Sequence, residues 1–405
     1  MSGGYLEVLR TAGALRVFVP ALVGRLSFAM VTLVLLFAVQ RSTDSFAIAG
    51  AAIGAFGLAN VIASPYRARF VDRRGQRFAL NSLAIAFAAG LSGIAALTAQ
   101  SGPPAGVLIG LAAVVGLFPP PLGASMRVLW GSITMPGALR TKAYSVDAVC
   151  EELLFTTGPL IAAAIVGAAS PMIGLLATAL VAVVGTLGMT SSSLSRGRVA
   201  VAASPRKRSR PLRQKGFIPV LIALLGVGVV LGTVEVVAPA VADTHGSVGL
   251  AGILLASFAA GSAVGGLLYG LRSWRSSLVN RLIILGTVMT VLCALLTTIG
   301  SFAVLGFGLA TVGFFLAPSL VTGYLLADDL TAAEVRTEAS SWINTAVNAG
   351  AAVAAAIVGF AVDAVEPRLG FIIGAGMALT LVVAASVPLL RNSRPAAVTD
   401  PVQSE

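Results

Sequence analysis

The sequence predicts an all-α integral membrane protein with twelve transmembrane helices in two bundles of six. Hydrophobic residues make up 57% of the chain and charged residues 11%, whereas about 25% of residues are charged in a soluble domain. Twelve apolar stretches are each long enough to cross a hydrocarbon core of about 30 Å, and without water there each must form a helix. The expected spans are 15–39, 47–67, 78–99, 105–130, 143–167, 171–190, 217–241, 248–271, 280–300, 302–327, 338–362 and 369–391.

The basic residues lie in alternate gaps between these stretches. Of 27 Lys and Arg, Arg25 and Arg127 lie well inside spans, and Arg41 and Arg368 lie in the odd-numbered gaps. The other 23 lie in the even-numbered gaps, in the two tails or at the span edges that face them. The positive-inside rule then places both termini in the cytoplasm and His245 outside. The net charge of +11 is therefore a topology signal and not the mark of a nucleic-acid-binding protein. We expect a multi-pass protein of the inner (plasma) membrane.

The chain divides at a basic segment in its middle. Residues 191–216 are rich in Ser, Arg and Pro and cannot bury a core, so they are expected to be a disordered cytoplasmic linker. The linker separates an N-terminal six-helix bundle, 1–190, from a C-terminal one, 217–391, and a disordered tail follows at 392–405.

The two bundles share short matching segments. Three pairs occur in the same order and at nearly constant offset, which indicates a duplicated six-helix unit. Because six is even, both copies have the same orientation in the membrane, so they are parallel repeats. The pairs are 18–20 with 217–219, 115–121 with 312–318, and 158–167 with 350–359.

The gap after the second span carries a motif, ARFVDRRGQR. Asp72, Arg73, Gly75 and Arg77 fit the pattern G-x-x-x-D-R-x-G-R, although Arg77 comes one place late and Ala68 replaces the first glycine. With the twelve spans and the central basic linker, the chain resembles the major facilitator superfamily, in particular its bacterial, drug-exporter-like members. The resemblance covers essentially the whole chain and implies a substrate site at midplane between the bundles.

The resemblance implies that this motif is a conformational latch on the cytoplasmic side, formed by Asp72, Arg73, Gly75 and Arg77. In physical terms, Gly75 permits a tight turn and Asp72 is suited to a neighbouring helix N-terminus, which carries partial positive charge. The alternative is an ordinary positive-inside loop with an incidental acid.

Charged residues in spans four and five are candidate functional groups. Arg127 and Gly131 resemble an R-x-x-x-G element of the family, and an arginine at this depth needs a partner or a wet cavity. Asp147 and Glu151 are four residues apart and share a helix face, and Glu152 lies about 100° around. One acid is expected to pair with Arg127 and another to titrate. A shallow, solvated helix start is the alternative, and it suits Asp147 better than Glu152.

Four further residues stand out inside spans. Glu235 is the only acid well inside span seven and, with no basic residue in its own helix, is the favoured proton carrier ahead of Glu151 and Glu152. Arg25 lies deep in span one, where it needs an acid or water. Asn344 and Asn348 share one face of span eleven and suit either substrate binding or helix–helix hydrogen bonding.

These features predict a secondary active transporter, specifically proton-coupled export of small amphipathic, drug-like molecules by alternating access. Export and substrate class follow from the resemblance, including a Gly158–Pro159 pair like that of antiporters. Uptake of a small metabolite such as a sugar or organic anion, bound by Arg25 and Arg127, is the alternative within transport. A non-transporting membrane sensor or assembly partner is the alternative of another class.

The sequence carries no sign of an enzyme. It has no phosphate-binding G-x-x-x-x-G-K-[ST] loop, no zinc motif and no nucleophile elbow. We therefore expect no cofactor, no metal and no nucleic-acid partner. The expected partners are a small-molecule substrate, protons and the lipid bilayer, and the protein is expected to be a monomer.

Overall fold

The computed structural model describes residues 5–99, 104–196, 210–244, 248–364 and 366–392. His245, half of the predicted linker (197–209) and nearly all of the predicted tail lie outside these ranges. Regular structure in the described ranges is helical throughout. The first half contains α1 Tyr5–Arg10, α2 Ala14–Thr43, α3 Phe46–Arg74, α4 Gln76–Thr98, α5 Ala105–Gly116, α6 Leu122–Ile133, α7 Ala138–Ala168, α8 Pro171–Ser191 and α9 Ser193–Arg196.

The second half has a matching series of long helices. It contains η1 Pro211–Arg213, α10 Phe217–Thr244, α11 Val248–Leu271, α12 Leu278–Leu295, η2 Leu296–Thr298, α13 Phe302–Gly313, α14 Leu316–Leu330, η3 Ala333–Val335, α15 Arg336–Ala364 and α16 Leu369–Asn392.

Ten helical stretches in the described ranges are long and apolar enough to cross a membrane. They coincide with ten of the predicted spans. The other two predicted spans correspond to α3 and to the α5–α6 pair, and α5 alone is too short to cross a bilayer.

Two predicted spans are interrupted. The span expected at 105–130 stops at Gly116 and resumes at Leu122. Pro119, Pro120 and Pro121 lie between, and proline lacks the N–H that would continue the helix ladder. The span expected at 302–327 is likewise divided into α13 and α14.

The motif expected to form a loop over 68–77 is mostly helical. α3 continues through Arg74, and α4 begins at Gln76. Only Gly75 breaks the helix, with φ 82° and ψ 153°, a conformation that a side chain would strain. The turn predicted at Gly75 is therefore present, but it is a single residue long.

Glycines bring helices into close contact at equivalent places in the two halves. A Cβ at any of four glycines would lie within 2.4 Å of a neighbouring helix, so no larger residue fits without movement. Two of these contacts join α5 to α3 and α13 to α11, and two join α7 to α2 and α15 to α10, which supports the predicted duplication. The pairs are Gly116 with Phe56, Gly313 with Phe258, Gly158 with Ala29, and Gly350 with Leu225.

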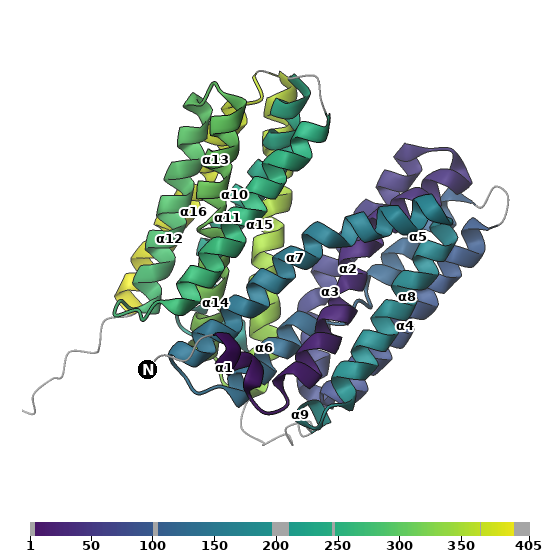
Figure 1. Cartoon of the computed structure of the whole chain (residues 1–405), viewed down its shortest axis with the longest axis horizontal. Coiled ribbons are helices and arrows are strands. Elements are labelled where there is room, and N and C mark those ends of the chain that lie inside the picture. Colours follow the sequence, from purple (N-terminus) through teal and green to yellow (C-terminus); the bar gives the residue numbers. More distant parts are fainter. Residues whose placement is uncertain (1–4, 100–103, 197–209, 245–247, 365, 393–405) are drawn as a thin grey trace, which may run out of the picture.

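The two halves meet at one end of the molecule and diverge at the other. Figure 1 shows the helices converging near α1, α6 and α9 and separating toward the opposite end. The main contacts between the halves are α7 with α11 and α3 with α15. We call the converging end the closed end.

At the closed end, α11 crosses α7 through a glycine. A Cβ at Gly270 would lie 2.7 Å from Ser145 Oγ on α7 and 2.5 Å from the hydroxyl of Tyr5 on α1. Tyr5 also donates a hydrogen bond to the carbonyl of Leu267 on α11. Helix α1, which the sequence analysis did not anticipate, thus joins the first half of the chain to the second.

Gly270→Leu should separate the halves at the closed end, because the new side chain collides with both Ser145 and Tyr5. The control is Gly252→Leu in the same helix, since a Cβ there meets nothing within 4 Å. Spin labels at Phe78 and Arg272, in a protein whose two native cysteines are replaced by alanine, report the separation. Equal distances in both variants would show that this crossing does not control closure.

Candidate functional site

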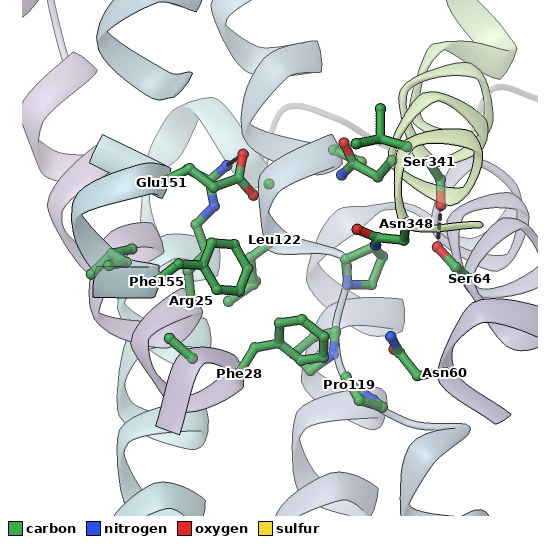
Figure 2. Close-up of a pocket in the computed structure, with 18 of the residues that line it drawn as sticks. Arg25, Phe28, Asn60, Ser64, Pro119, Leu122, Glu151, Phe155, Ser341 and Asn348 are labelled. Atoms are coloured by element: carbon green, nitrogen blue, oxygen red, sulfur yellow. Dashed lines mark hydrogen bonds and ion pairs between the residues drawn. The ribbon is translucent and has the colours of Figure 1, made fainter. Parts of the chain in front are cut away.

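A cavity of about 420 Å³ lies between the two halves. Small-molecule sites commonly enclose about 300–1,000 Å³. Helices α2, α3 and α7 and the break between α5 and α6 line it from the first half, and α10, α14 and α15 line it from the second. Figure 2 shows Pro119, from that break, at the cavity wall.

Beside the cavity, two arginines and two acids form a charge cluster of Arg25, Arg127, Asp147 and Glu151. Arg25 donates to both carboxylate oxygens of Asp147, at 2.9 and 3.1 Å. Arg127 donates to Glu151 at 2.6 Å, and Arg25 lies 3.2 Å from the same carboxylate oxygen. Two positive and two negative charges therefore compensate one another, which makes four charged groups tolerable at membrane depth.

Local sequence makes room for this charge cluster. A Cβ at Gly123, near the start of α6, would lie 2.6 Å from the guanidinium of Arg25. Glycine at this position lets Arg25 reach across to α7. Asp147 and Glu151 meet the arginines together because they share one face of α7.

The charge cluster also contacts the second half of the protein. The Arg127 guanidinium lies 3.8 Å from the ring centroid of Tyr324 on α14, within the range of a cation–π interaction. The Tyr324 hydroxyl donates to the side-chain oxygen of Asn344 on α15 at 2.5 Å. Arg127 thereby connects the acids of α7 to two helices of the other half.

Asp147 is not in a shallow, solvated position. Its side chain is fully buried (0% exposed) and lies 3.4 Å from Arg127 as well as against Arg25. The alternative of a shallow, solvated helix start does not apply to Asp147, because α7 begins nine residues earlier at Ala138 and carries Asp147 into the bundle.

Two of the three predicted proton-coupling acids stand apart from the charge cluster. Glu152 on α7 and Glu235 on α10 both line the cavity. In the described ranges neither carboxylate has an ion pair, whereas Glu151 has two. Glu235 is exposed to the cavity and Glu152 is partly exposed.

Two polar stripes face the cavity from α3 and α15. Asn60, Ser64 and Arg67 have the spacing i, i+4, i+7, and the hydroxyl of Ser64 lies 2.6 Å from that of Ser341 on the other stripe. Asn344 and Asn348 were predicted from the sequence as site residues, whereas Ser341 and the α3 stripe were not. Helical spacing of polar residues inside an apolar span was the available signal. The second stripe comprises Ser341, Asn344 and Asn348.

Arg67 is buried without a carboxylate partner among the described residues. It donates to the carbonyl of Gly116 at 2.9 Å and to the side-chain oxygen of Asn60 at 2.7 Å. The first bond satisfies a carbonyl at the end of α5, where the proline break leaves the last carbonyls without helical partners. Arg67 therefore stabilises the broken helix at the cavity.

The motif acid lies where the sequence predicted, at a helix N-terminus. Asp72 accepts a hydrogen bond of 3.0 Å from the backbone N–H of Glu338, in the first turn of α15. Arg69, which was not among the predicted latch residues, binds the Glu338 carboxylate through two hydrogen bonds of 2.5 and 3.0 Å. Arg73 and Arg77 are exposed, and neither makes an ion pair in the described part of the chain.

A second polar contact reinforces the closed end. Asp328 on α14 accepts a hydrogen bond from the Tyr144 hydroxyl and lies 3.6 Å from Arg140 and 3.7 Å from Arg336. Gly131, singled out with Arg127 in the sequence, lies beside this contact, because a Cβ there would be 3.3 Å from Asp328. The glycine leaves space for the acid.

Comparisons with known proteins agree with this architecture. A family model described as Major Facilitator Superfamily matches residues 220–404. The solved structure of the human organic anion transporter MFSD10 (TETRAN) is similar, with a TM-score of 0.71 and 14% identity over 95% of this chain and 100% of that one. The chain has the major facilitator fold. The predicted superfamily fold, all-helical with multiple membrane-crossing helices, is thus confirmed.

A second similar structure is that of a bacterial homologue of the iron transporter ferroportin in an outward-facing state. Its TM-score is 0.69 at 15% identity, over 94% of this chain and 99% of that one. No curated protein matches the sequence. At these identities the major facilitator fold is shared, and the substrates named for the two neighbours are theirs.

Asp147→Asn should destabilise the protein by about 3–5 kcal/mol, because removing one member of a buried ion-pair group leaves the others uncompensated. The matched control is Glu152→Gln in the same helix, whose carboxylate has no described ion-pair partner. Thermal unfolding of the purified variants in detergent compares them. Equal stability of the two variants would contradict the structural role assigned to the charge cluster.

Closure at the closed end should depend on pH through Asp72, at the end of α3 beyond its apolar stretch. Burial raises the pKa of the Asp72 carboxyl to about 7, although the hydrogen bond it accepts from the backbone of Glu338 acts to lower it. Protonation therefore stabilises the closed arrangement fully below about pH 4, the ordinary pKa of an exposed Asp, and this contribution is lost as the pH rises through 7. The spin-label pair should thus report more separation at pH 8 than at pH 5.

Asp72→Asn should remove this difference between pH 5 and pH 8, because an amide does not ionise. Glu334→Gln, at an exposed acid close to α15, is the control and should leave the difference unchanged. A pH dependence that persists in the Asn variant would assign it to another group.

Proposed function

We propose that the protein is a secondary active transporter that exports small amphipathic molecules in exchange for protons by alternating access. The observation that carries the proposal is a cavity lined by both halves and sealed at one end by ion pairs between them. Two acids that line it have no ion-pair partner among the described residues. Rocking of the halves around such a cavity would expose it to each side in turn.

The sidedness of the proposal follows from charge. The exposed basic residues Arg73, Arg74 and Arg77 lie at the closed end, where the positive-inside rule predicts the cytoplasm. On this assignment both termini are cytoplasmic, the membrane is the plasma membrane and the described conformation is outward-open. We further propose that one chain is sufficient, because one chain contributes both walls of the cavity.

Proton coupling is assigned to Glu152 and Glu235. Protonation of Glu151 would weaken its ion pairs with Arg25 and Arg127 and leave buried positive charge uncompensated. Glu152 and Glu235 can gain or lose a proton without breaking an ion pair in the described ranges. They also belong to different halves, so their charge state acts on the contact between the halves.

The geometry gives less support to uptake of an anion. That alternative required Arg25 and Arg127 to face the substrate, but both guanidinium groups are bound to Asp147 and Glu151. A role without transport predicts that the cavity acids are dispensable, which the following experiment also tests.

Glu235→Gln should abolish transport against a gradient yet spare exchange of substrate between equal compartments, because Gln mimics a permanently protonated carboxyl. Glu152→Gln should lower the number of protons exchanged, and Glu334→Gln should change neither. The measurement is flux and internal pH in proteoliposomes, with a compound chosen because it raises the thermal stability of the purified protein.

The proton-coupled mechanism would be excluded if the Gln variants of Glu151, Glu152 and Glu235 each retained uphill transport with an unchanged pH dependence. Absence of any flux in the unmodified protein, across compounds that stabilise it, would favour a sensor or assembly partner.

A further inference from the structure

The charges around the cavity are unevenly compensated. Arg25 and Glu151 line it but are paired within the charge cluster. Glu152 and Glu235 contribute negative charge from α7 and α10, and they have no ion pairs within the described ranges. The α7–α10 wall of the cavity is therefore an acceptor surface with an unmatched negative charge, which favours a cationic group in the substrate.

The wall formed by α3 and α15 has the opposite polarity. A guanidinium only donates hydrogen bonds, so the side-chain atom of Asn60 facing Arg67 at 2.7 Å must be its oxygen. The NH₂ group of Asn60 is then the part that remains for the cavity. The oxygen of Asn344 accepts a hydrogen bond from the Tyr324 hydroxyl, which leaves the NH₂ group of this amide as well. This wall offers two amide groups as donors.

An anion is not the natural ligand of this donor wall. Arg67 is the only guanidinium on the α3 stripe, and its bonds to Gly116 and Asn60 occupy it. The donors that remain are neutral amides and a hydroxyl, which suit a carbonyl oxygen. Figure 2 shows Asn60, Ser64 and Asn348 on one side of the cavity and Glu151 and Phe155 on the other.

An aromatic pair from α2 and α7 supplies apolar surface in the cavity. Phe28 of α2 and Phe155 of α7 pack edge to face with ring centroids 6.2 Å apart, and both line the cavity. Figure 2 shows both rings in the cavity. Such a pair accommodates an aromatic group.

We infer that the substrate is a dipolar aromatic cation, with a basic amine against Glu152 and Glu235 and a carbonyl acceptor against the amide of Asn60. The inference rests on the proposed function and specifies its substrate class. It also implies that the amine and the protons compete for the same two carboxylates, so that binding of one releases the other. A single amine balances one of the two carboxylate charges, so binding of a monocation releases one proton and leaves the second carboxyl protonated.

The test compares two cationic probes on the full-length purified protein by isothermal titration calorimetry. Procainamide carries a tertiary amine and an aromatic amide carbonyl, whereas tetraphenylphosphonium is a cation without an acceptor. Glu235→Gln should weaken both probes by about tenfold or more, as expected for loss of a charged contact. Glu334→Gln should weaken neither.

Asn60→Asp is the decisive variant, because it keeps an oxygen for Arg67, whose charge compensates the new carboxylate, and it removes the donor group. It should lower the affinity for procainamide relative to tetraphenylphosphonium by about tenfold. Asn280→Asp, at an exposed asparagine on α12, should leave that ratio unchanged. N-butylbenzamide, which is neutral, should bind at least tenfold more weakly than procainamide.

Three results would overturn the inference. The first is that procainamide does not bind to the unmodified protein. The second is that Asn60→Asp leaves the ratio of the affinities for procainamide and tetraphenylphosphonium unchanged. The third is that benzoate binds with the same affinity as procainamide and that Arg67→Met abolishes benzoate binding. If the protein still transported other compounds in exchange for protons, the proposed function would hold and only the inferred substrate class would be wrong. Loss of both binding and flux for every compound would remove the proposed function as well.

Discussion

The mutual compensation of Arg25, Arg127, Asp147 and Glu151 is the interaction on which the rest of the structure depends. Four charged groups enter an apolar bundle, where each alone would be costly, and they are tolerated because each guanidinium has a carboxylate at hydrogen-bond distance. This arrangement fixes α2, α6 and α7 relative to one another. It also distinguishes two acids of α7. Glu151 is ion-paired with both arginines, whereas Glu152 lines the cavity without an ion pair in the described ranges.

The break between α5 and α6 and the charge cluster depend on each other. Three prolines end the helix beside the cavity, and Arg67 satisfies a carbonyl that the break exposes. The restarted helix then places Gly123 where the Arg25 guanidinium passes. An uninterrupted helix would present a different face to α2. The interruption that the sequence analysis overlooked thus shapes both the charge cluster and the cavity.

Arg127 and Tyr324 connect chemistry in one half to position in the other. The Arg127 guanidinium, which is ion-paired with Glu151, also lies over the Tyr324 ring. Tyr324 in turn donates a hydrogen bond to Asn344 on α15. The first turn of the same helix is held at the closed end by Asp72 and Arg69. α15 therefore contacts both the cavity and the residues that keep the halves together. A two-state movement of α15 would couple ligand occupancy of the cavity to contact between the halves at the closed end.

The sequence by itself determined the class of the protein, because span length, apolar content and basic gaps are local properties set by the bilayer. It also identified Arg25, Arg127 and the acids of α7 and α10, since charges inside apolar spans are conspicuous. Only the tertiary structure decided which acid is paired, because Asp147, Glu151 and Glu152 differ by their distance to helices far away in the chain. For the same reason the sequence predicted no specific role for Arg67 and Arg69, which lie at the end of the second predicted span. Their roles depend on Gly116 and Glu338, which are neighbours in space but distant in sequence.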